Sequence, residues 1–446
     1  MTIKVHPPLE AARWPVPRDW IALDDLCDGI FDCPHSTPEL TNAGPYVARS
    51  QDVRTGVFRA DEAAHVSDAT YQERIARAEP TWGDLLYSRE GTYFGIAAEV
   101  PKNMRVCLGQ RMVLIRPKKG KLDSTFLRLW LNSPTLTRHI HGFRDGTVAE
   151  RLNMPTIRAL PIPDFHPREQ EQLASILGSI DEKIELNRQL STTLEATARA
   201  IFEDWFIEYG PTYSKLESGT SYLSRRMWSL FPARFDSDGQ PENWKPCALS
   251  DLIDLNPPER LAPGTIAPYL DMAALPTSGS WPQDSSLREV GSGTRFRNGD
   301  TLLARITPCL ENGKTAFVSF LRDGEVGWGS TEFIVMRPRP PLPPEFAYLL
   351  ARNDGFRDYA IRSMTGTSGR QRVQTDAIRE FPLVRPGEPV LREFADLVGP
   401  HFRKIAANAL ESRTLAATRD LLLPKLISGE MRLRDAKEIA PEVAGA

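Results

Sequence analysis

Residues 173–198 read LASILGSIDEKIELNRQLSTTLEATA, and residues 394–419 read FADLVGPHFRKIAANALESRTLAATR. The two stretches share ten identities in 26 positions without a gap, at a shift of 221 residues. Composition alone would give roughly two identities. The apolar residues of the first stretch alternate at spacings of four and three, the pattern of a helix that pairs with another helix. The repeat therefore predicts one long helix in each half of the chain.

The two helices are expected to pair with each other in antiparallel orientation. The first seam comprises Leu173, Leu177, Ile180, Ile184, Asn187, Ser191, Leu194, Ala198, Ile201 and Trp205. Asn187 and Asn408 occupy equivalent positions, where a polar residue fixes pairing and register at a cost in stability. Gly399-Pro400 predicts a kink or a restart of the second helix, and Pro424 a bend in its last turns. The alternative is that both are ordinary core helices packed on their own domains.

The repeat continues outside the helices. GDLLYSR at 83–89 returns as GDTLLAR at 299–305, and IRALP at 157–161 returns as IREFP at 378–382. RMVLIRP at 111–117 and EFIVMRP at 332–338 both predict strands. The chain is therefore expected to contain two diverged copies of an α+β unit of about 220 residues, related by pseudo-two-fold symmetry.

The composition is that of a soluble globular protein. The 446 residues are 41% hydrophobic and 25% charged. No apolar run approaches the roughly 18 residues of a membrane span, and Met1–Val16 lacks the apolar core of a signal peptide, so we expect a cytoplasmic protein without a membrane partner. The five cysteines are scattered without a C-x-x-C motif, which favours a reducing compartment and predicts no metal site.

Charge gives a local signal rather than a global one. The net charge is −3, but residues 102–121 hold seven Lys or Arg and no acid. Residues 352–379 hold six Arg against three Asp. Basic stretches of this kind can supply phosphate contacts even in an acidic chain, or can be solvated surface.

Two motifs resemble catalytic signatures incompletely. LNPPER at 255–260 is similar to the Asn-Pro-Pro-aromatic box of amino-methyltransferases, but Glu259 cannot stack on a flipped base. PCLENGKT at 308–315 ends like a phosphate-binding loop, but Pro308 replaces the first glycine. Without a recognisable active site, the duplicated chain is better interpreted as a binder of two spaced sites, such as DNA half-sites.

Several stretches, in this order, resemble the specificity subunits of type I restriction–modification systems. They are PYVARSQDVRTG, GDLLYSR, GTVAERLNMPTIRALPIPDFHPREQEQLASIL, LEATARAIFEDWFIEYGP and TLAATRDLLLPKLISGEMRL. The resemblance covers about residues 15–432. It implies a non-catalytic chain without a cofactor, whose two target-recognition domains each read one half of a split, asymmetric double-stranded DNA site. It also implies that the two helices form an antiparallel coiled coil that sets the spacing.

The same resemblance implies partners and a division of the chain. Two methylation subunits, which bind S-adenosylmethionine, are expected to dock on the helices, and restriction subunits to join them. The expected parts are target-recognition domain 1 at 1–165, helix 1 at 166–208, a linker at 209–241, target-recognition domain 2 at 242–386, helix 2 at 387–432 and a disordered tail at 433–446.

The candidate DNA-contacting residues lie in turns that both copies place near arginine. Glycine allows close approach of the backbone, Thr and Ser donate hydrogen bonds, and Arg can bind phosphate or guanine in a bidentate manner. The first copy contributes Arg89, Gly91 and Thr92, then Arg144, Gly146, Thr147 and Arg151. The second copy contributes Arg305, Thr307, Asn312 and Lys314, then Gly366, Thr367, Ser368, Arg370 and Arg372. The alternative is a set of β-turns with solvated side chains.

A partner-binding surface is expected at the helix ends. Apolar side chains lie beyond a single seam at Ile201, Phe202, Trp205, Phe206, Leu422 and Leu426, with Leu421 and Leu423 beside them. If exposed, they would mark the docking site of a methylation subunit; alternatively they pack on each other. Two other classes of function remain open: a DNA methyltransferase or nuclease with diverged motifs, and a coiled-coil scaffold that does not bind DNA.

Overall fold

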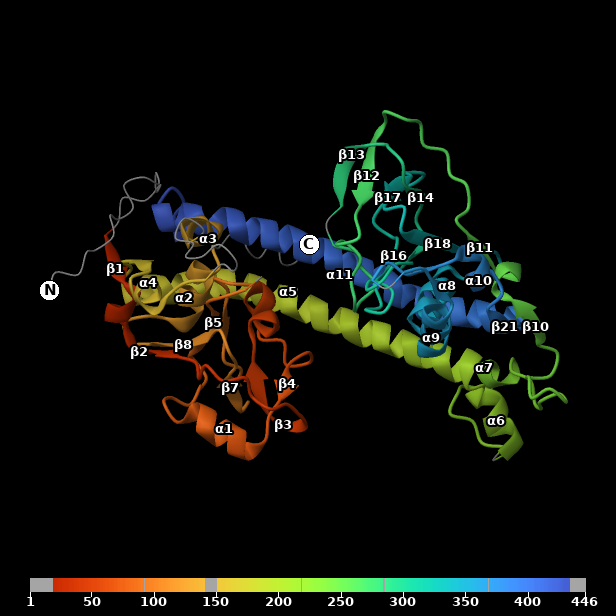
Figure 1. The fold of residues 1–446 in the computed structure, drawn as a ribbon, viewed down its shortest axis with the longest axis horizontal. Coiled ribbons are helices and arrows are strands. Elements are labelled where there is room, and N and C mark those ends of the chain that lie inside the picture. Colours follow the sequence, from red (N-terminus) through yellow and green to blue (C-terminus); the bar gives the residue numbers. More distant parts are fainter. Residues whose placement is uncertain are drawn as a thin grey trace. The chain divides into compact units, whose positions relative to one another are not determined.

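The computed structural model describes residues 19–91, 93–140, 151–217, 219–283, 285–367 and 369–433 (Figure 1). The chain divides into two compact units, one formed by residues 1–184 and 413–446 and the other by residues 185–412. The two long helices, α5 (Pro167–Phe202) and α11 (Glu388–Ser428), each contribute to both units. The first unit is therefore assembled from two stretches that are far apart in the sequence.

The described residues of the first unit form three sheets. Their strand orders are β2-β8-β5-β6, β4-β3-β7 and β1-β9. The strands are β1 (Trp20–Ala22), β2 (Cys27–Asp32), β3 (Thr41–Ala48), β4 (Ala64–His65), β5 (Leu85–Ser88), β6 (Ala97–Glu99), β7 (Val106–Leu108), β8 (Met112–Pro117) and β9 (Pro161–Pro163). The short helices are α1 (Asp68–Ile75), α2 (Ser124–Leu131), α3 (Pro134–Ile140) and α4 (Met154–Arg158).

The second unit has corresponding sheets, with strand orders β11-β18-β15-β16, β13-β12-β17-β14 and β10-β21, and a small β19-β20 hairpin. The strands are β10 (Lys245–Ala248), β11 (Ile253–Leu255), β12 (Ile266–Leu270), β13 (Ser286–Glu289), β14 (Thr294–Phe296), β15 (Thr301–Ala304), β16 (Thr315–Phe317), β17 (Gly327–Gly329), β18 (Phe333–Pro338), β19 (Met364–Thr365), β20 (Arg372–Val373) and β21 (Pro382–Arg385). The short helices are α6 (Gly210–Glu217), α7 (Arg225–Ser229), α8 (Pro344–Arg352), α9 (Asp354–Arg362) and α10 (Thr375–Arg379).

The duplication predicted from the sequence is confirmed at the level of strand order. The predicted strands at 111–117 and 332–338 are β8 and β18, and each pairs with the strand of the repeated Gly-Asp motif, β5 or β15. All four residues of β5 and all four of β15 are buried, because their two faces contact different apolar clusters. The α+β fold class, with two related domains and two long helices, is therefore confirmed.

The repeated Gly-Asp motif is explained by a buried ion pair. Gly83 and Gly299 have φ of +95° and +88°, which favour glycine. The aspartate that follows accepts two hydrogen bonds from an arginine of the neighbouring strand: Asp84 from Arg116 and Asp300 from Arg337. Asp84 and Asp300 are 3% and 0% exposed. Burying a charged carboxylate costs free energy, and the ion pair with the arginine offsets that cost.

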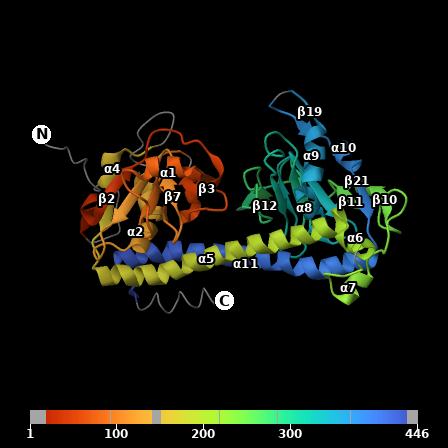
Figure 2. The same cartoon turned by 90° about the horizontal axis from the view of Figure 1, so that it is seen from below.

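The core of each unit includes parts of both long helices. In the first unit, Leu177 and Ile180 of α5 share one cluster with Leu415 and Leu422 of α11. In the second unit, Ala198 and Phe202 of α5 share one with Phe394, Val398 and Phe402 of α11. In each unit a short helix, α2 or α8, lies between the four-stranded sheet and the long helices (Figure 2).

The polar seam residues join the two helices within the second unit. Asn187 donates to Glu411 Oε2 at 2.7 Å, and Asn408 donates to Ser191 Oγ at 3.1 Å and to the Asn187 carbonyl at 3.3 Å. Because Asn187 meets residue 411 while Ser191 meets residue 408, the two helices run antiparallel there. Asn187 and Asn408 are 3% and 1% exposed, so they lie inside the seam as predicted.

The glycine that both copies place in the long helix lies at a close helix contact. A Cβ atom at Gly178 would be 3.2 Å from Thr125 Cγ2, and one at Gly399 would be 3.7 Å from Glu345 Oε1. Thr125 and Glu345 are the second residues of α2 and α8. A Cβ atom at Gly178 would therefore crowd the start of α2. One at Gly399 would be in ordinary van der Waals contact with Glu345 and closer, at 3.2 Å, to Arg403 Nη1.

The predicted restart of the second helix is wrong, whereas a kink at Gly399-Pro400 or a bend at Pro424 stays a prediction. The helix α11 runs without a break from Glu388 to Ser428, through Pro400 and Pro424. Proline removes one backbone donor, which would leave the carbonyl of Asp396 without its helical partner. Pro400 and Asp396 are both exposed, so water can satisfy that carbonyl and the helix continues.

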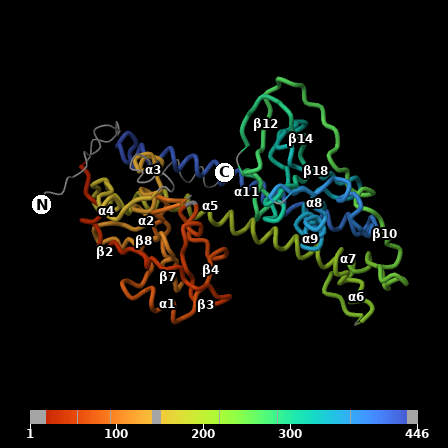
Figure 3. The backbone as a smooth tube through the Cα atoms, viewed as in Figure 1, coloured from red at the N-terminus to blue at the C-terminus, as the bar shows by residue number. Residues whose placement is uncertain are grey.

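The segment expected to be a linker contains structure of its own (Figure 3). The helices α6 and α7 lie within residues 209–241, after a π-helical turn at Glu203–Ile207 that continues α5. Aromatic rings pack there: Tyr213 contacts Phe235, and Phe231 contacts Trp205 of the π-helical turn. The tail from residue 434 lies outside the described residues.

No helix in the described part of the chain has the length and apolar character that a membrane crossing requires.

The ion pair of the repeated motif gives a stability prediction. Asp300→Ala should destabilise the second unit by about 3 kcal/mol, because it leaves Arg337 buried with only Glu259 as a partner. Scanning calorimetry should show a lower melting temperature. Asp323→Ala, at an exposed position, is the control and should leave melting unchanged. Equal melting of both variants would contradict the role of the pair.

Candidate nucleic-acid interface

In both units the two candidate turns meet at the end of the motif strand. In the first unit, the Leu152 amide donates to the Arg89 carbonyl at 2.8 Å, and Glu90 forms a β-bridge with Arg151. In the second unit, the Val373 amide donates to the Arg305 carbonyl at 3.0 Å, and Ile306 forms a β-bridge with Arg372. The structure thus brings together the turns that the sequence proposed from separate regions, at equivalent places.

The backbone frame is the same in the two units, but the charges differ. The Arg89 amide donates to the carbonyl of Arg111, and the Arg305 amide donates to the carbonyl of Glu332. Arg111 pairs with Glu90 at 3.2 Å, whereas Glu332 pairs with Arg372 at 2.7 Å. The position next to the candidate arginine is therefore cationic in one unit and anionic in the other.

In the first unit, Asp32 orients the side chain of Arg89, and the side chain of Arg151 is exposed. The Arg89 guanidinium donates to Asp32 Oδ2 at 3.2 Å, and 17% of its side chain is exposed. Among the described residues, the side chain of Arg151 has no ion pair or hydrogen bond. Gly91, with φ of +98°, supplies the turn between them. Thr92, Arg144, Gly146 and Thr147 lie outside the described residues.

In the second unit, an ion pair holds the β19-β20 hairpin against the end of β15. Arg372 donates to both oxygens of Glu332 at 2.7 to 2.9 Å, and the pKa of Glu332 is lowered by these hydrogen bonds. Arg305 donates to Gln374 Oε1 at 3.1 Å. The buried Arg305 Nε and Thr307 Oγ1 find no partner in the described structure. These two polar atoms are candidates for contacts with a ligand.

The exposed part of this hairpin carries three of the predicted residues. Gly366, Thr367 and Arg370 are all exposed between β19 and β20, and Gly366 has φ of +128°. A two-stranded ribbon of this kind can enter the major groove of DNA. Ser368 lies outside the described residues.

Two predicted residues are placed differently from the rest. Lys314 donates to the Met272 carbonyl at 2.8 Å from a partly buried position, so its ammonium group supports a loop. A contact of Lys314 with DNA stays a prediction. Asn312 is exposed on the same loop.

The arginines of the basic stretches are partly neutralised within the chain. Arg105, Arg111 and Arg116 pair with Asp68, Glu90 and Asp84. Arg352, from the second stretch, is 6% exposed and donates to backbone carbonyls. The acids come from distant segments, which is why charge counts along the sequence overstate the available positive surface.

The predicted exposure of the helix ends is also wrong. Phe202, Trp205 and Phe206 are buried in the core of the second unit, and Leu422, Leu423 and Leu426 in that of the first. Ile201 is partly buried against the same core, and Leu421 is 58% exposed. The side chains cover the domains of their own chain, so the observation that pointed to a partner surface is absent. Partner binding there stays an untested prediction.

Sequence reasoning missed the acidic and amide residues that orient the arginines. These are Asp32, Glu90, Glu332 and Gln374. Glu332 lies within a stretch interpreted only as a strand, EFIVMRP. The only available signal was that Glu90 directly follows Arg89.

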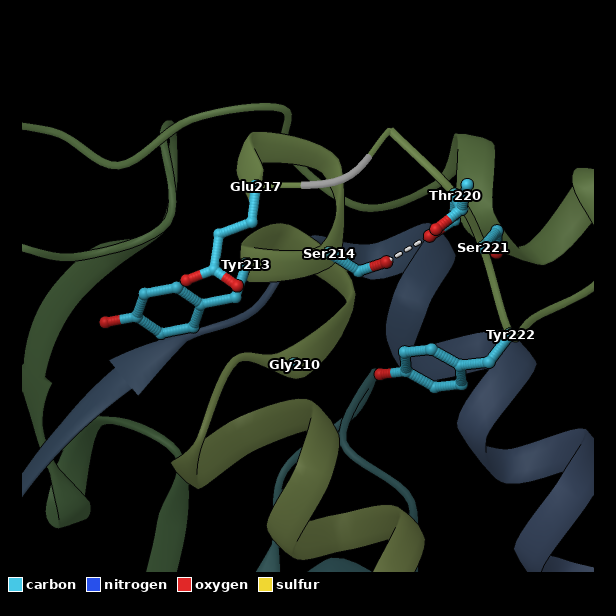
Figure 4. A pocket seen from close by; sticks show the side chains of 7 residues that line it. All are labelled: Gly210, Tyr213, Ser214, Glu217, Thr220, Ser221 and Tyr222. Carbon is cyan, nitrogen blue, oxygen red and sulfur yellow. Dashed lines mark hydrogen bonds between the residues drawn. The ribbon is translucent and has the colours of Figure 1, made fainter.

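The candidate turns hold no metal cluster in the described part of the chain. No group of three or more metal-ligating side chains is found among the described residues. An open pocket occurs in the segment 209–241, where Tyr213 and Tyr222 flank Ser214 and Thr220 (Figure 4). Its lining contains none of the candidate residues.

The fold and the paired turns define a class of protein: a duplicated binding protein in which each α+β domain is completed by halves of two antiparallel helices. A family model described as "Type I restriction modification DNA specificity domain" matches residues 43–196. Residues 43–196 thus match the DNA specificity domain of type I restriction–modification systems, and the chain is similar along most of its length to specificity subunits of these systems.

Relatives of full length support this assignment. The chain is 22% identical to the HindI specificity subunit of Haemophilus influenzae, over 87% of this chain and 95% of that one. It is 23% identical to the MjaIX specificity subunit of Methanocaldococcus jannaschii, over 83% and 82%. The crystal structure of a type I S subunit from M. genitalium has a similar fold, with a TM-score of 0.52 and 15% identity over 94% and 98%.

The Glu332–Arg372 pair gives a pH prediction. The lowered pKa of Glu332 means that the pair stabilises the hairpin above the ordinary carboxyl pKa of 4.5, and that this contribution is lost as the pH falls through the lowered value. Glu332→Gln should reproduce the loss at neutral pH. Hydrogen exchange should then show smaller protection factors at Val373 and Thr307. Glu289→Gln, on the exposed strand β13, is the control. Unchanged protection in Glu332→Gln would show that the pair does not hold the hairpin.

Proposed function

We propose that this chain is the non-catalytic DNA-reading subunit of its complex, and that each globular domain reads one half of a bipartite double-stranded site. The observation that carries the proposal is the meeting of two arginine-bearing turns at the same place in both units. In each case the backbone is held by hydrogen bonds and glycine permits close approach. Such turns suit contacts to phosphates and to base edges.

The two half-sites are expected to differ in sequence. Arg111 and Glu332 stand at equivalent positions with opposite charge, and the second unit presents Arg370 on a hairpin. Domains with the same backbone frame but different side chains select different bases. The site is therefore proposed to be asymmetric, with an unread spacer between its halves.

Catalysis is assigned to partners. Two methylation subunits, which bind S-adenosylmethionine, are proposed to dock on the long helices, and restriction subunits to join that assembly in the cytoplasm. The names of the relatives, which are specificity subunits of restriction enzymes, support this division of roles. The buried helix ends do not identify the docking residues.

A methylation assay separates this proposal from a diverged methyltransferase. The purified chain with S-adenosylmethionine and DNA should transfer no methyl group, and addition of the methylation subunits from the same host should restore transfer. Methyl transfer by the chain alone would contradict the proposal. DNA binding that weakens with salt would exclude a scaffold that never contacts DNA.

Arg151 and Arg370 give a domain-specific prediction. Each exposed arginine is expected to affect only the half-site of its own domain. Arg151→Ala or Arg370→Ala should lower affinity by about 1–3 kcal/mol and relax one base position if the side chain reads a base, or reduce the salt slope by about 1 if it binds phosphate. Selection from a randomised DNA library measures both. Arg225→Ala, exposed on α7, is the control. An effect on both half-sites, or none, would contradict the assignment.

The long helices are proposed to set the spacer. Four residues inserted into α5 near Asn187 would add about 6 Å of helix. Because base pairs are stacked about 3.4 Å apart, the preferred spacer should change by one or two base pairs while both half-sites are retained. Methylation mapping of DNA modified by the complex measures both the spacer length and the half-site sequences. Altered half-site sequences with an unchanged spacer would show that the helices do not set the spacer length.

A further inference from the structure

Arg128 of α2 and Tyr348 of α8 occupy equivalent positions in the two units. Each lies three residues after Thr125 or Glu345, the residues that face the shared glycine of the long helix. Arg128 is 9% exposed and Tyr348 0%. Both side chains are therefore buried where a globular domain meets the long helices.

In the first unit, Arg128 is part of an ion network that joins the domain to both helices. Its Nη1 donates to Asp181 Oδ2 of α5 at 2.6 Å, and its Nε donates to Glu99 of β6 at 3.2 Å. The other oxygen of Asp181 accepts from Arg419 of α11 at 2.7 Å. One carboxylate thus connects the domain, α5 and α11.

In the second unit, Tyr348 makes the same connection with different chemistry. Its hydroxyl donates to Glu195 Oε1 of α5 at 2.6 Å, and its ring lies 5.5 Å from that of Phe402 of α11. Burial, together with the charge of Glu195, raises the pKa of Tyr348 well above its ordinary value, so the phenol keeps the proton that it donates. Arg352 Nε donates to the same hydroxyl at 3.0 Å.

Each connection continues into the loop after the motif strand. Arg352 also donates to the carbonyl of Gly313 at 2.8 Å, in the loop that carries Thr307 and Asn312, and to that of Thr315, the first residue of β16, at 3.1 Å. Asn132, four residues after Arg128, exchanges two hydrogen bonds of 2.8 Å with the backbone of Ala97, the first residue of β6, where the loop that begins at Gly91 ends. The candidate DNA-contacting loops are thus tied to the long helices through these short helices.

The physical role of these contacts is orientation. Apolar packing has no preferred direction, so it allows a short helix to rotate or slide on the long ones. Hydrogen bonds and buried ion pairs have strict distances and angles, and breaking them leaves an uncompensated buried group. These contacts therefore favour a single orientation of the domain on the long helices.

We propose that Arg128 and Tyr348 are positioning residues, each of which fixes the orientation of its domain and of its DNA-contacting loop on the adjoining part of the helix pair. The link to DNA reading rests on the proposed function. We call the contacts of Arg128 and of Tyr348 with the long helices the two joints. They are not interchangeable, because the residue equivalent to Asp181 of the first joint is Phe402, and the residue equivalent to Glu195 of the second joint is Ala416. A domain moved to the other half of the helix pair must carry its joint residues with it.

The joint of the second unit can be tested without DNA. Nitroxide labels on unnatural amino acids at the exposed positions Thr192 and Leu287 report the distance between α5 and the domain, by pulsed electron paramagnetic resonance. The wild type should give one narrow distance distribution. Tyr348→Phe, which removes only the hydroxyl, should broaden it or add a second population.

Matched variants separate orientation from general stability. Tyr359→Phe also removes a phenol that donates a 3.0 Å hydrogen bond, to Ala377 on the same domain, and should leave the distribution narrow. Glu195→Gln keeps an acceptor oxygen and should retain the wild-type distribution, whereas Glu195→Ala should broaden it. If Tyr348→Phe does not fold, Glu195→Ala carries the test. A distribution as narrow as the wild type in Tyr348→Phe, or in Glu195→Ala, overturns the proposal.

A second readout links the joint to function. In the complex with its methylation subunits, Tyr348→Phe should methylate sites with spacers one base pair longer or shorter than the wild-type spacer, with both half-sites retained. Broadened distances with unchanged spacer selection would overturn the link to DNA reading. A wild-type complex that selects no bipartite site would contradict the proposed function, and the label distances would still decide the joint.

Discussion

The structure depends on one constraint: neither globular domain closes its core without parts of both long helices. The first unit needs residues from 413 onward, and Leu415 and Leu422 pack there beside Leu177 and Ile180. The second unit needs the end of α5, where Phe202 packs beside Phe394 of α11. Because apolar burial is the main driving force of folding, the domains and the helix pair must form together. The buried helix ends, which the sequence suggested were a docking surface, are a consequence of this constraint.

Buried polar groups give this apolar arrangement its register. Asn187 and Asn408 align the helices, and the Asp84–Arg116 and Asp300–Arg337 pairs align the central strands. A buried polar or charged side chain that loses its partner raises the free energy of the folded state, so arrangements with a shifted register are disfavoured. Both copies hold these residues, which is why they carried the internal repeat.

Around that common frame the two units have diverged in charge. Arg111 and Glu332 share a backbone position and have opposite charge, so Glu90 is neutralised in one unit and Arg372 in the other. The joints with the long helices differ in the same way, as an ion network at Arg128 and a phenol–carboxylate pair at Tyr348. Duplication thus preserved the geometry, while the side chains became specific to each half.

The sequence by itself determined the duplication, the two long helices, their polar seam and the two turns of each candidate interface. These features depend on local periodicity and on short motifs, which are readable along the chain. Tertiary structure decided which charges are available: Lys314 supports a loop, Arg105 and Arg116 are paired, and Phe206 is buried. Their partners are brought close only by folding. It also decided that α11 passes through Pro400, because the effect of a proline depends on whether the carbonyl that it leaves unpaired faces water or the core.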